Sequence, residues 1–124
     1  MADFIFHKNT GLLQHGSQQW PAVSGGGRYQ ALQSKIYHVP ANSLMSGTDH
    51  SAGVPYNSKY AHKAFKDINN FGWFQWLGEA GLGIHPDGNV PGTEGCIGIK
   101  TPNTRALFDL LKQFKNRSFT LEVK

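Results

Sequence analysis

Glycine and proline recur so often along this sequence that the chain must turn frequently and its regular elements must be short. Fifteen glycines and six prolines are spread over 124 residues, and both residue types favour turns over long helices or strands. Hydrophobic residues still make up 39% of the chain and charged residues only 16%, a balance typical of a folded protein. With this length and no internal repeat, we expect a single domain over residues 1–124.

Alternating apolar residues predict β structure near both ends of the chain. Residues 3–13 place two apolar runs on either side of the turn-forming residues 9–11, so a hairpin is expected there, with glycine supplying the turn conformation. Residues 35–39 alternate enough for a strand. Residues 118–123 alternate apolar and polar side chains as a strand buried on one face does.

One segment near the C-terminus has the spacing of an amphipathic helix. Thr101 and Pro102 suit a helix cap and first turn, and the helix is expected to end near Lys115. Residues 60–69 could hold a second, short helix, whereas residues 24–27 predict a tight loop and residues 40–57 a long surface connection. The apolar face of the C-terminal helix consists of Ala106, Leu107, Leu110, Leu111 and Phe114.

The segment from Phe71 to Leu77 is the most aromatic part of the chain. Buried aromatic residues dominate small cores, so the first interpretation is a core segment. The alternative is that one or two of Trp73, Phe74 and Trp76 line a groove for a substrate. Of these, Trp73 is the candidate substrate-binding residue.

A single cysteine carries the strongest functional signal. It excludes an internal disulfide and every zinc site built from paired cysteines. A thiol becomes a good nucleophile when a nearby imidazole takes its proton, and His85 precedes Cys96 by 11 residues across a loop rich in glycine and proline. The N–H groups around Gly95 and Cys96 could then donate to the oxyanion formed at an attacked carbonyl. Taken alone, a small buried cysteine is the commoner interpretation.

The surrounding motif changes that balance. Ile84-His85 is followed by a loop and then by residues 93–99, Thr-Glu-Gly-Cys-Ile-Gly-Ile. This run resembles the L,D-transpeptidase catalytic domain, also called the YkuD-type domain, which joins an upstream histidine to a Ser-x-Gly-Cys-aliphatic segment. The opening hairpin and residues 21–26 are similar to the start of that family. The resemblance implies a mainly β, α+β fold of two packed curved sheets with one or two helices.

The resemblance also implies an activity. Cys96 would form a thioester during cleavage or exchange of peptidoglycan stem peptides, with His85 as base and with neither cofactor nor metal. Thr93 stands at the family's serine position and would help to shape the oxyanion site, although hydrogen bonding within the loop explains it as well. Glu94 stands where the family commonly has a second histidine, and the resemblance places it with Gly95 at the oxyanion or substrate-binding site. Glu94 or Asp87 would orient His85, or would serve only turn formation and solubility.

The short loop resembles compact variants found in phage lytic proteins and interbacterial toxin effectors, so a wall-damaging role is expected. An effector would have an immunity or inhibitor protein as partner. The chain has neither a secretory signal nor the roughly 18 to 20 consecutive apolar residues that span a bilayer. We therefore expect synthesis in the cytoplasm without membrane insertion, and action on the cell wall or periplasm after export by another route.

Charge and histidine content give alternatives less support. The net charge of +4 favours anionic partners or serves solubility, but the basic residues form no run, so nucleic acid is not expected as a partner. Six histidines show no metal-ligand spacing.

The second hypothesis is a non-enzymatic wall-binding or phage structural module in which Cys96 is merely buried. An activated Cys96 should react with thiol reagents well below the ordinary thiol pKa of about 8.5.

Overall fold

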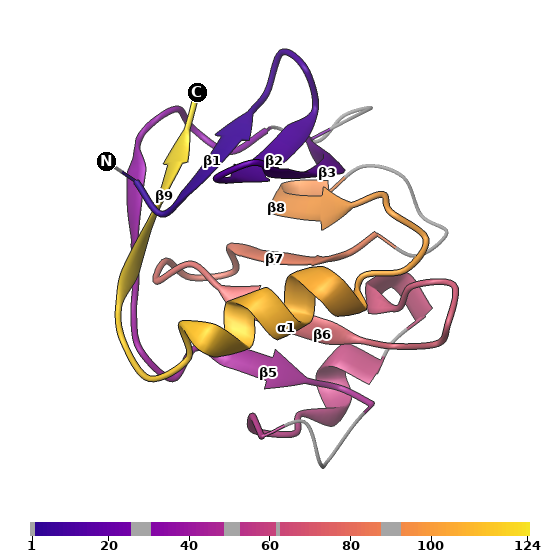
Figure 1. Cartoon of the computed structure of the whole chain (residues 1–124). Coiled ribbons are helices and arrows are strands. Elements are labelled where there is room, and N and C mark those ends of the chain that lie inside the picture. The colour runs from indigo at the N-terminus through magenta and orange to yellow at the C-terminus, as the bar shows by residue number, and fades with distance from the viewer. Residues whose placement is uncertain (1, 26–30, 49–52, 62, 88–92) are drawn as a thin grey trace.

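The computed structural model describes residues 2–25, 31–48, 53–61, 63–87 and 93–124, without the side chains of residue 64 and residues 93–95. In these ranges the chain forms short strands, one α-helix and two 3-10 turns (Figure 1). The strands are β1 (Phe4–His7), β2 (Leu12–His15), β3 (Gln18–Gly25), β4 (Ile36–Val39), β5 (Leu44–Ser46), β6 (Trp73–Trp76), β7 (Gly83–Pro86), β8 (Thr93–Ile99) and β9 (Phe119–Val123). The helical elements are η1 (Ser58–Ala61), η2 (Lys63–Phe65) and α1 (Arg105–Gln113).

The strands form one mixed, curled sheet in the order β4-β9-β1-β2-β3-β8-β7-β6-β5. Strand β3 joins its two halves, because residues 18–21 pair with β2 and residues 22–25 pair with β8. Pro21 lies where the strand changes partners: it has no N–H to donate, and its carbonyl accepts the N–H of Lys100 at 2.8 Å. The expected mainly β fold with curved layers is confirmed, with the two layers continuous through β3.

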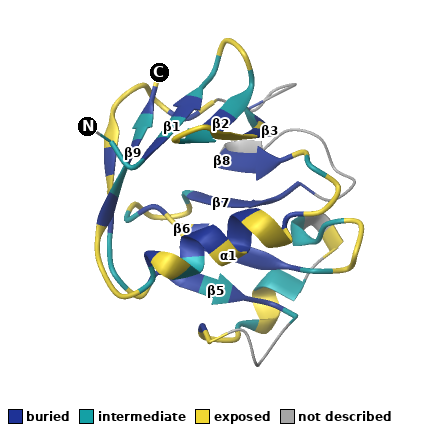
Figure 2. Ribbon diagram, in the orientation of Figure 1, coloured by how far each residue is buried: buried dark blue, intermediate teal, exposed yellow. Residues whose placement is uncertain are grey.

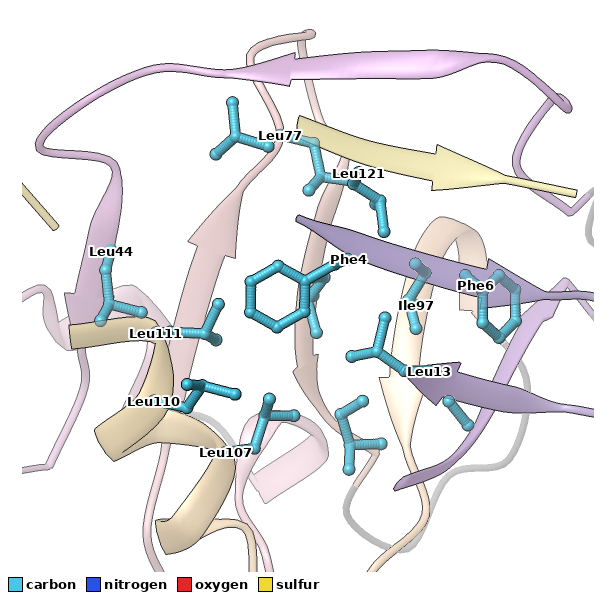
Figure 3. Close-up of a cluster of buried hydrophobic side chains, with 14 of the residues drawn as sticks. Phe4, Phe6, Leu13, Leu44, Leu77, Ile97, Leu107, Leu110, Leu111 and Leu121 are labelled. Atoms are coloured by element: carbon cyan, nitrogen blue, oxygen red, sulfur yellow. The ribbon is translucent and has the colours of Figure 1, made fainter. Parts of the chain in front are cut away.

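The hydrophobic core lies inside the curl. Figure 3 shows Phe4 and Leu13 of the N-terminal strands facing Ile97 of β8 and the leucines of α1. Figure 2 shows the same pattern along the elements, with buried residues on the inner side of α1 and along β7 and β8. Helix α1 therefore closes the inner face of the β5 to β8 half of the sheet, and the outer face of that half is left for other segments.

Helix α1 begins later than the Thr101-Pro102 pair predicted. Its first residue is Arg105, because the Asp67 carboxylate accepts both the N–H and the hydroxyl of Thr104 at 2.8 Å and fixes the chain there. The Thr104 hydroxyl oxygen also accepts the indole N–H of Trp73 at 2.8 Å. A tertiary contact thus sets this helix start, which a local capping pattern does not reveal.

The buried face of α1 differs from the predicted apolar face, since Ala106 is exposed and Phe108 is buried. The hairpin, the strand near residues 35–39 and the closing strand are confirmed. The helix predicted over 60–69 is wrong, because only the 3-10 turns η1 and η2 form there, and the connection predicted over 40–57 contains β5. The loop predicted over 24–27 starts within β3, and its last two residues lie outside the described ranges. Within those ranges, no helix is long and apolar enough to cross a membrane.

Candidate active site

The register of two parallel strands places Cys96 and His85 on one face of the sheet. Strands β7 and β8 pair Ile84 with Ile97 and His85 with Gly98. Side chains alternate between faces along a strand, so Cys96 shares the face of Gly98 and lies one diagonal step from His85. Ile84 and Ile97 point the opposite way into the core, with exposed fractions of 0%.

The same face extends across β6 and β5 as an aromatic surface. Trp76 pairs with Gly83, and Met45 pairs with Phe74. Together with residues from η1 and η2, this surface forms a cavity of about 360 Å³ that Cys96 lines, which we call the cysteine cavity. The cavity is lined by Met45, Lys59, Tyr60, Phe65, Phe74, Trp76, Gly81 and Cys96.

His85 is held beneath two aromatic rings. The Phe65 ring meets the imidazole edge-on with centroids 4.6 Å apart, and the Phe74 ring stacks on it at 6.1 Å. The Nδ1 atom lies 2.6 Å from the carbonyl oxygen of Pro86. A carbonyl can only accept, so Nδ1 carries the proton and Nε2 of the neutral ring is the free base. Burial lowers the pKa of His85, an effect that the Pro86 carbonyl partly offsets, so the ring is neutral at pH 7.

Cys96 is a protonated thiol at rest rather than a preformed thiolate. Its residue is 8% exposed, and burial raises the pKa of the thiol while a hydrogen bond from the Gly83 backbone lowers it in part. The sulfur also lies 3.3 Å from the Gly81 carbonyl, to which it donates. The lowered thiol pKa expected from an activated cysteine is therefore not found. The resting pair is a neutral thiol and a neutral imidazole, which suits proton transfer during the attack.

The backbone of β8 leaves its regular ladder at the cysteine. Strand β3 pairs Val23 with Gly98 but Gly25 with Thr93, so the register shifts by three residues between these pairs. Gly95 and Cys96 fall within the shifted segment. An irregular strand of this kind re-aims backbone groups, which is what an oxyanion site built from their N–H groups requires.

The other residues predicted for the site either lie outside the described part of the structure or lie away from the cavity. The side chains of Thr93 and Glu94 and residues 88–92 lie outside the described part of the chain. Trp73 is not in the cavity: it is 0% exposed, faces the core and packs on Phe108 of α1, so its prediction as a substrate-binding residue is wrong. Its neighbours along β6, Phe74 and Trp76, occupy the groove instead.

Asp87 follows β7 and is 7% exposed, with an Oδ1 atom that has no hydrogen-bond partner among the described residues. Burial raises the pKa of this carboxyl to about 6, while the charge of Lys100 lowers it in part. Among the described residues Asp87 makes no hydrogen bond to the imidazole, whose Nδ1 is bound to the Pro86 carbonyl, so a backbone carbonyl, rather than Asp87, orients His85.

Asp87→Asn is expected to stabilise the protein at pH 8 but not at pH 4. The folded carboxyl has a pKa of about 6 against 3.8 for the exposed group, so its contribution is intact below 3.8 and is lost as the pH rises through 6. The neutral amide does not suffer that loss. Thermal unfolding of both proteins at the two pH values checks this, and an equal gain at pH 4 would contradict it.

Gly83→Ala is expected to destabilise the protein by about 1–3 kcal/mol through overpacking. A Cβ atom at Gly83 would lie 2.1 Å from the Phe74 ring, and that ring is held between Tyr60, at 4.5 Å, and His85. Chemical denaturation measures the loss. In a Phe74→Leu background the same glycine substitution should cost less, and an undiminished cost would show that the ring is not the obstacle.

Comparison with known proteins identifies this architecture. No protein-family model and no curated protein matches the chain, but solved structures do. L,D-transpeptidase 1 from Mycobacterium tuberculosis matches with a TM-score of 0.58 and 14% identity, covering 98% of this chain and 59% of its own. The chain has the L,D-transpeptidase fold. An L,D-transpeptidase from Mycobacterium smegmatis matches with a TM-score of 0.55 and 11% identity, covering 99% of this chain and 59% of its own.

The chain thus spans 59% of the length of both L,D-transpeptidase structures. The sequence motif predicts Cys96 and His85 as the catalytic pair, but it does not point to the cavity residues from η1 and η2. Their signal in the sequence is the aromatic pair Tyr60 and Phe65, which lies within the segment predicted as a short helix.

Proposed function

We propose that this chain is a cysteine-dependent enzyme that cleaves or exchanges peptidoglycan stem peptides, as an L,D-carboxypeptidase or L,D-transpeptidase. The observation that carries the proposal is the common face of β7 and β8, on which Cys96 lines an aromatic cavity and lies one diagonal step along the sheet from His85. The L,D-transpeptidase fold supports the choice of substrate class.

The neutral resting pair defines the proposed chemistry. Nε2 of His85 takes the thiol proton as the sulfur of Cys96 attacks the carbonyl between an L-centre and a D-residue. The N–H groups of Gly95 and Cys96 receive the developing oxyanion. His85 then returns the proton to the departing amine, leaving a thioester on Cys96. Water or an acceptor amine resolves the thioester, again losing a proton to His85, and the free thiol is restored.

Digestion of purified wall peptides tests the proposal. The parent protein should release or exchange the terminal D-residue, giving products distinguishable by mass, and should carry an acyl adduct on Cys96 during turnover. Cys96→Ala should show neither product nor adduct while keeping the parent's thermal unfolding. Unchanged products in the alanine variant would remove the thiol from the chemistry.

The burial of Cys96 favours a second candidate, a non-enzymatic wall-binding or phage structural module with an inert cysteine. Its 8% exposure and raised pKa are what an inert, buried thiol would have. This module would sediment with purified cell walls equally well as parent and as Cys96→Ala, and neither would alter the wall peptides. The mass analysis therefore separates the two candidates directly.

We further propose that the enzyme is a compact, wall-damaging type, akin to phage lytic proteins or interbacterial effectors, that acts in the wall or periplasm after export. An effector would be paired with an immunity or inhibitor protein. Directing the parent chain to the periplasm of a test bacterium should lyse the cells, whereas the same chain kept in the cytoplasm should not. Lysis by Cys96→Ala in the periplasm would contradict this role.

A further inference from the structure

A second cavity, of about 620 Å³, lies beside η2 and the end of β8. Three lysines line it: Lys63 from η2, Lys66 just after it, and Lys100 just after β8. We call it the lysine cavity. The rest of its lining consists of Asp67, Ile68, Asn70, Ile99, Thr101 and Pro102.

The lysine cavity carries an excess of positive charge. Asp67 is the one acidic residue that lines it, and both oxygens of that carboxylate already accept hydrogen bonds, Oδ1 from the N–H groups of Asn69 and Phe71 and Oδ2 from Thr104. Among the described residues, none of the three lysines lies within 4.0 Å of a carboxylate. Asp87 influences Lys100 through its charge but does not line the cavity.

One lysine of the lysine cavity directly follows the strand that carries the thiol. Cys96, Gly98 and Lys100 follow one another at every second position of an extended segment, so about 13 Å separate the cysteine from Lys100 along β8. The turn η2 contributes to both cavities, because Lys63 lines the lysine cavity and Phe65 lines the cysteine cavity and also packs on His85. Gly98 has no side chain, so no side chain at this position stands between Cys96 and Lys100.

We propose that the lysine cavity binds a free carboxylate of the stem peptide whose L,D carbonyl is attacked by Cys96. This inference rests on the proposed function and adds its recognition site. Stem peptides carry free carboxylates, and the flexible four-carbon side chains of the lysines can extend from this cavity toward a peptide bound at Cys96. Ammonium groups hold carboxylates by charge-assisted hydrogen bonds, and a concave, cationic site draws such ligands in.

Binding of synthetic stem peptides to the full-length Cys96→Ala protein tests the inference without turnover. The probes are a tetrapeptide with free carboxylates and the same peptide with those carboxylates amidated. The acidic peptide should bind about tenfold more tightly at low salt, the size expected for a charged hydrogen bond. Adding Lys63→Gln and Lys66→Gln should bring both affinities to the same value, and Lys100→Gln alone should reduce the difference.

The matched control removes two lysines elsewhere. Lys112 lies on α1, across the sheet from the site, and Lys124 follows β9, so Lys112→Gln with Lys124→Gln changes the net charge equally and should keep the tenfold preference. Equal binding of both peptides to the unaltered cavity, or a preference that survives the Lys63 and Lys66 substitutions, would overturn the inference. Tighter binding of a glycerol-phosphate oligomer than of the acidic peptide would overturn it in favour of a phosphodiester polymer.

The outcome is separable from that of the proposed function. Charge-dependent peptide binding with no change in digested wall peptides would sink the enzyme and leave the lysine cavity standing. Normal cleavage of acidic and amidated peptides alike, with equal KM, would do the reverse.

Discussion

Replacing His85 with asparagine is expected to lower the rate of stem-peptide cleavage by about 10²- to 10⁴-fold, the usual contribution of a general base. The asparagine amide can still donate to the Pro86 carbonyl that now holds Nδ1 at 2.6 Å, so the local fold is preserved while the basic nitrogen is lost. Initial rates at saturating and limiting peptide should show the loss in kcat. His38→Asn, on the exposed side of β4, is the control and should retain the parent rate.

The pH dependence gives an independent check on the same residue. Catalysis needs neutral His85, and burial lowers its pKa from 6.5. Activity should therefore persist as the pH falls to 6.5 and decline only below it. A decline centred above pH 6.5, or His85→Asn with the rate of the parent, would rule out this histidine as the base.

Trp73→Ala is expected to cost about 3–5 kcal/mol of unfolding free energy, the range for deleting a large buried aromatic side chain. The substitution empties a fully buried site against Phe108 and leaves the Thr104 hydroxyl without its indole donor. That hydroxyl and Asp67 together fix the start of α1. The free energy of unfolding of a small domain is about 5–15 kcal/mol. Chemical denaturation should therefore show a large fall in the denaturant concentration at the unfolding midpoint.

Trp76→Ala is the matched comparison on the same strand. Trp76 is 37% exposed and lines the cysteine cavity, so its removal should change stability by less than about 1 kcal/mol and raise KM instead. If both variants lost similar stability, the assignment of the two tryptophans to opposite faces of β6 would fail.

The predictable parts of the fold are those encoded by local pattern. Alternation gave the hairpin and β9, and helical spacing gave most of α1. The start of α1 was not predictable, because it depends on Asp67, which is 37 residues from Thr104. Strand β5 was also missed, since its three residues lie within a segment rich in turn formers.

The candidate site was predictable where chemistry fixes the residue type. A lone cysteine after glycine and an upstream histidine pointed to Cys96 and His85, and strand register brings them to one face. The choice of Trp73 failed because parity on β6 cannot be read from a continuous aromatic run. One of the two rings over His85, that of Phe65, comes from a 3-10 turn, whose side-chain directions no helical or strand period encodes.

Strand β3 has a mechanical meaning for the whole molecule. Among the described strands, β3 alone pairs with both halves of the sheet: with β2 of the half β4-β9-β1-β2, and with β8 of the half that carries the thiol. Figure 1 shows β3 lying between β2 and β8. If one half of the sheet unfolds, β3 loses its pairing on that side, so the other half loses support as well. Denaturation should therefore proceed as one all-or-none transition. The backbone amides with the slowest hydrogen exchange should be found in both halves of the sheet rather than in one.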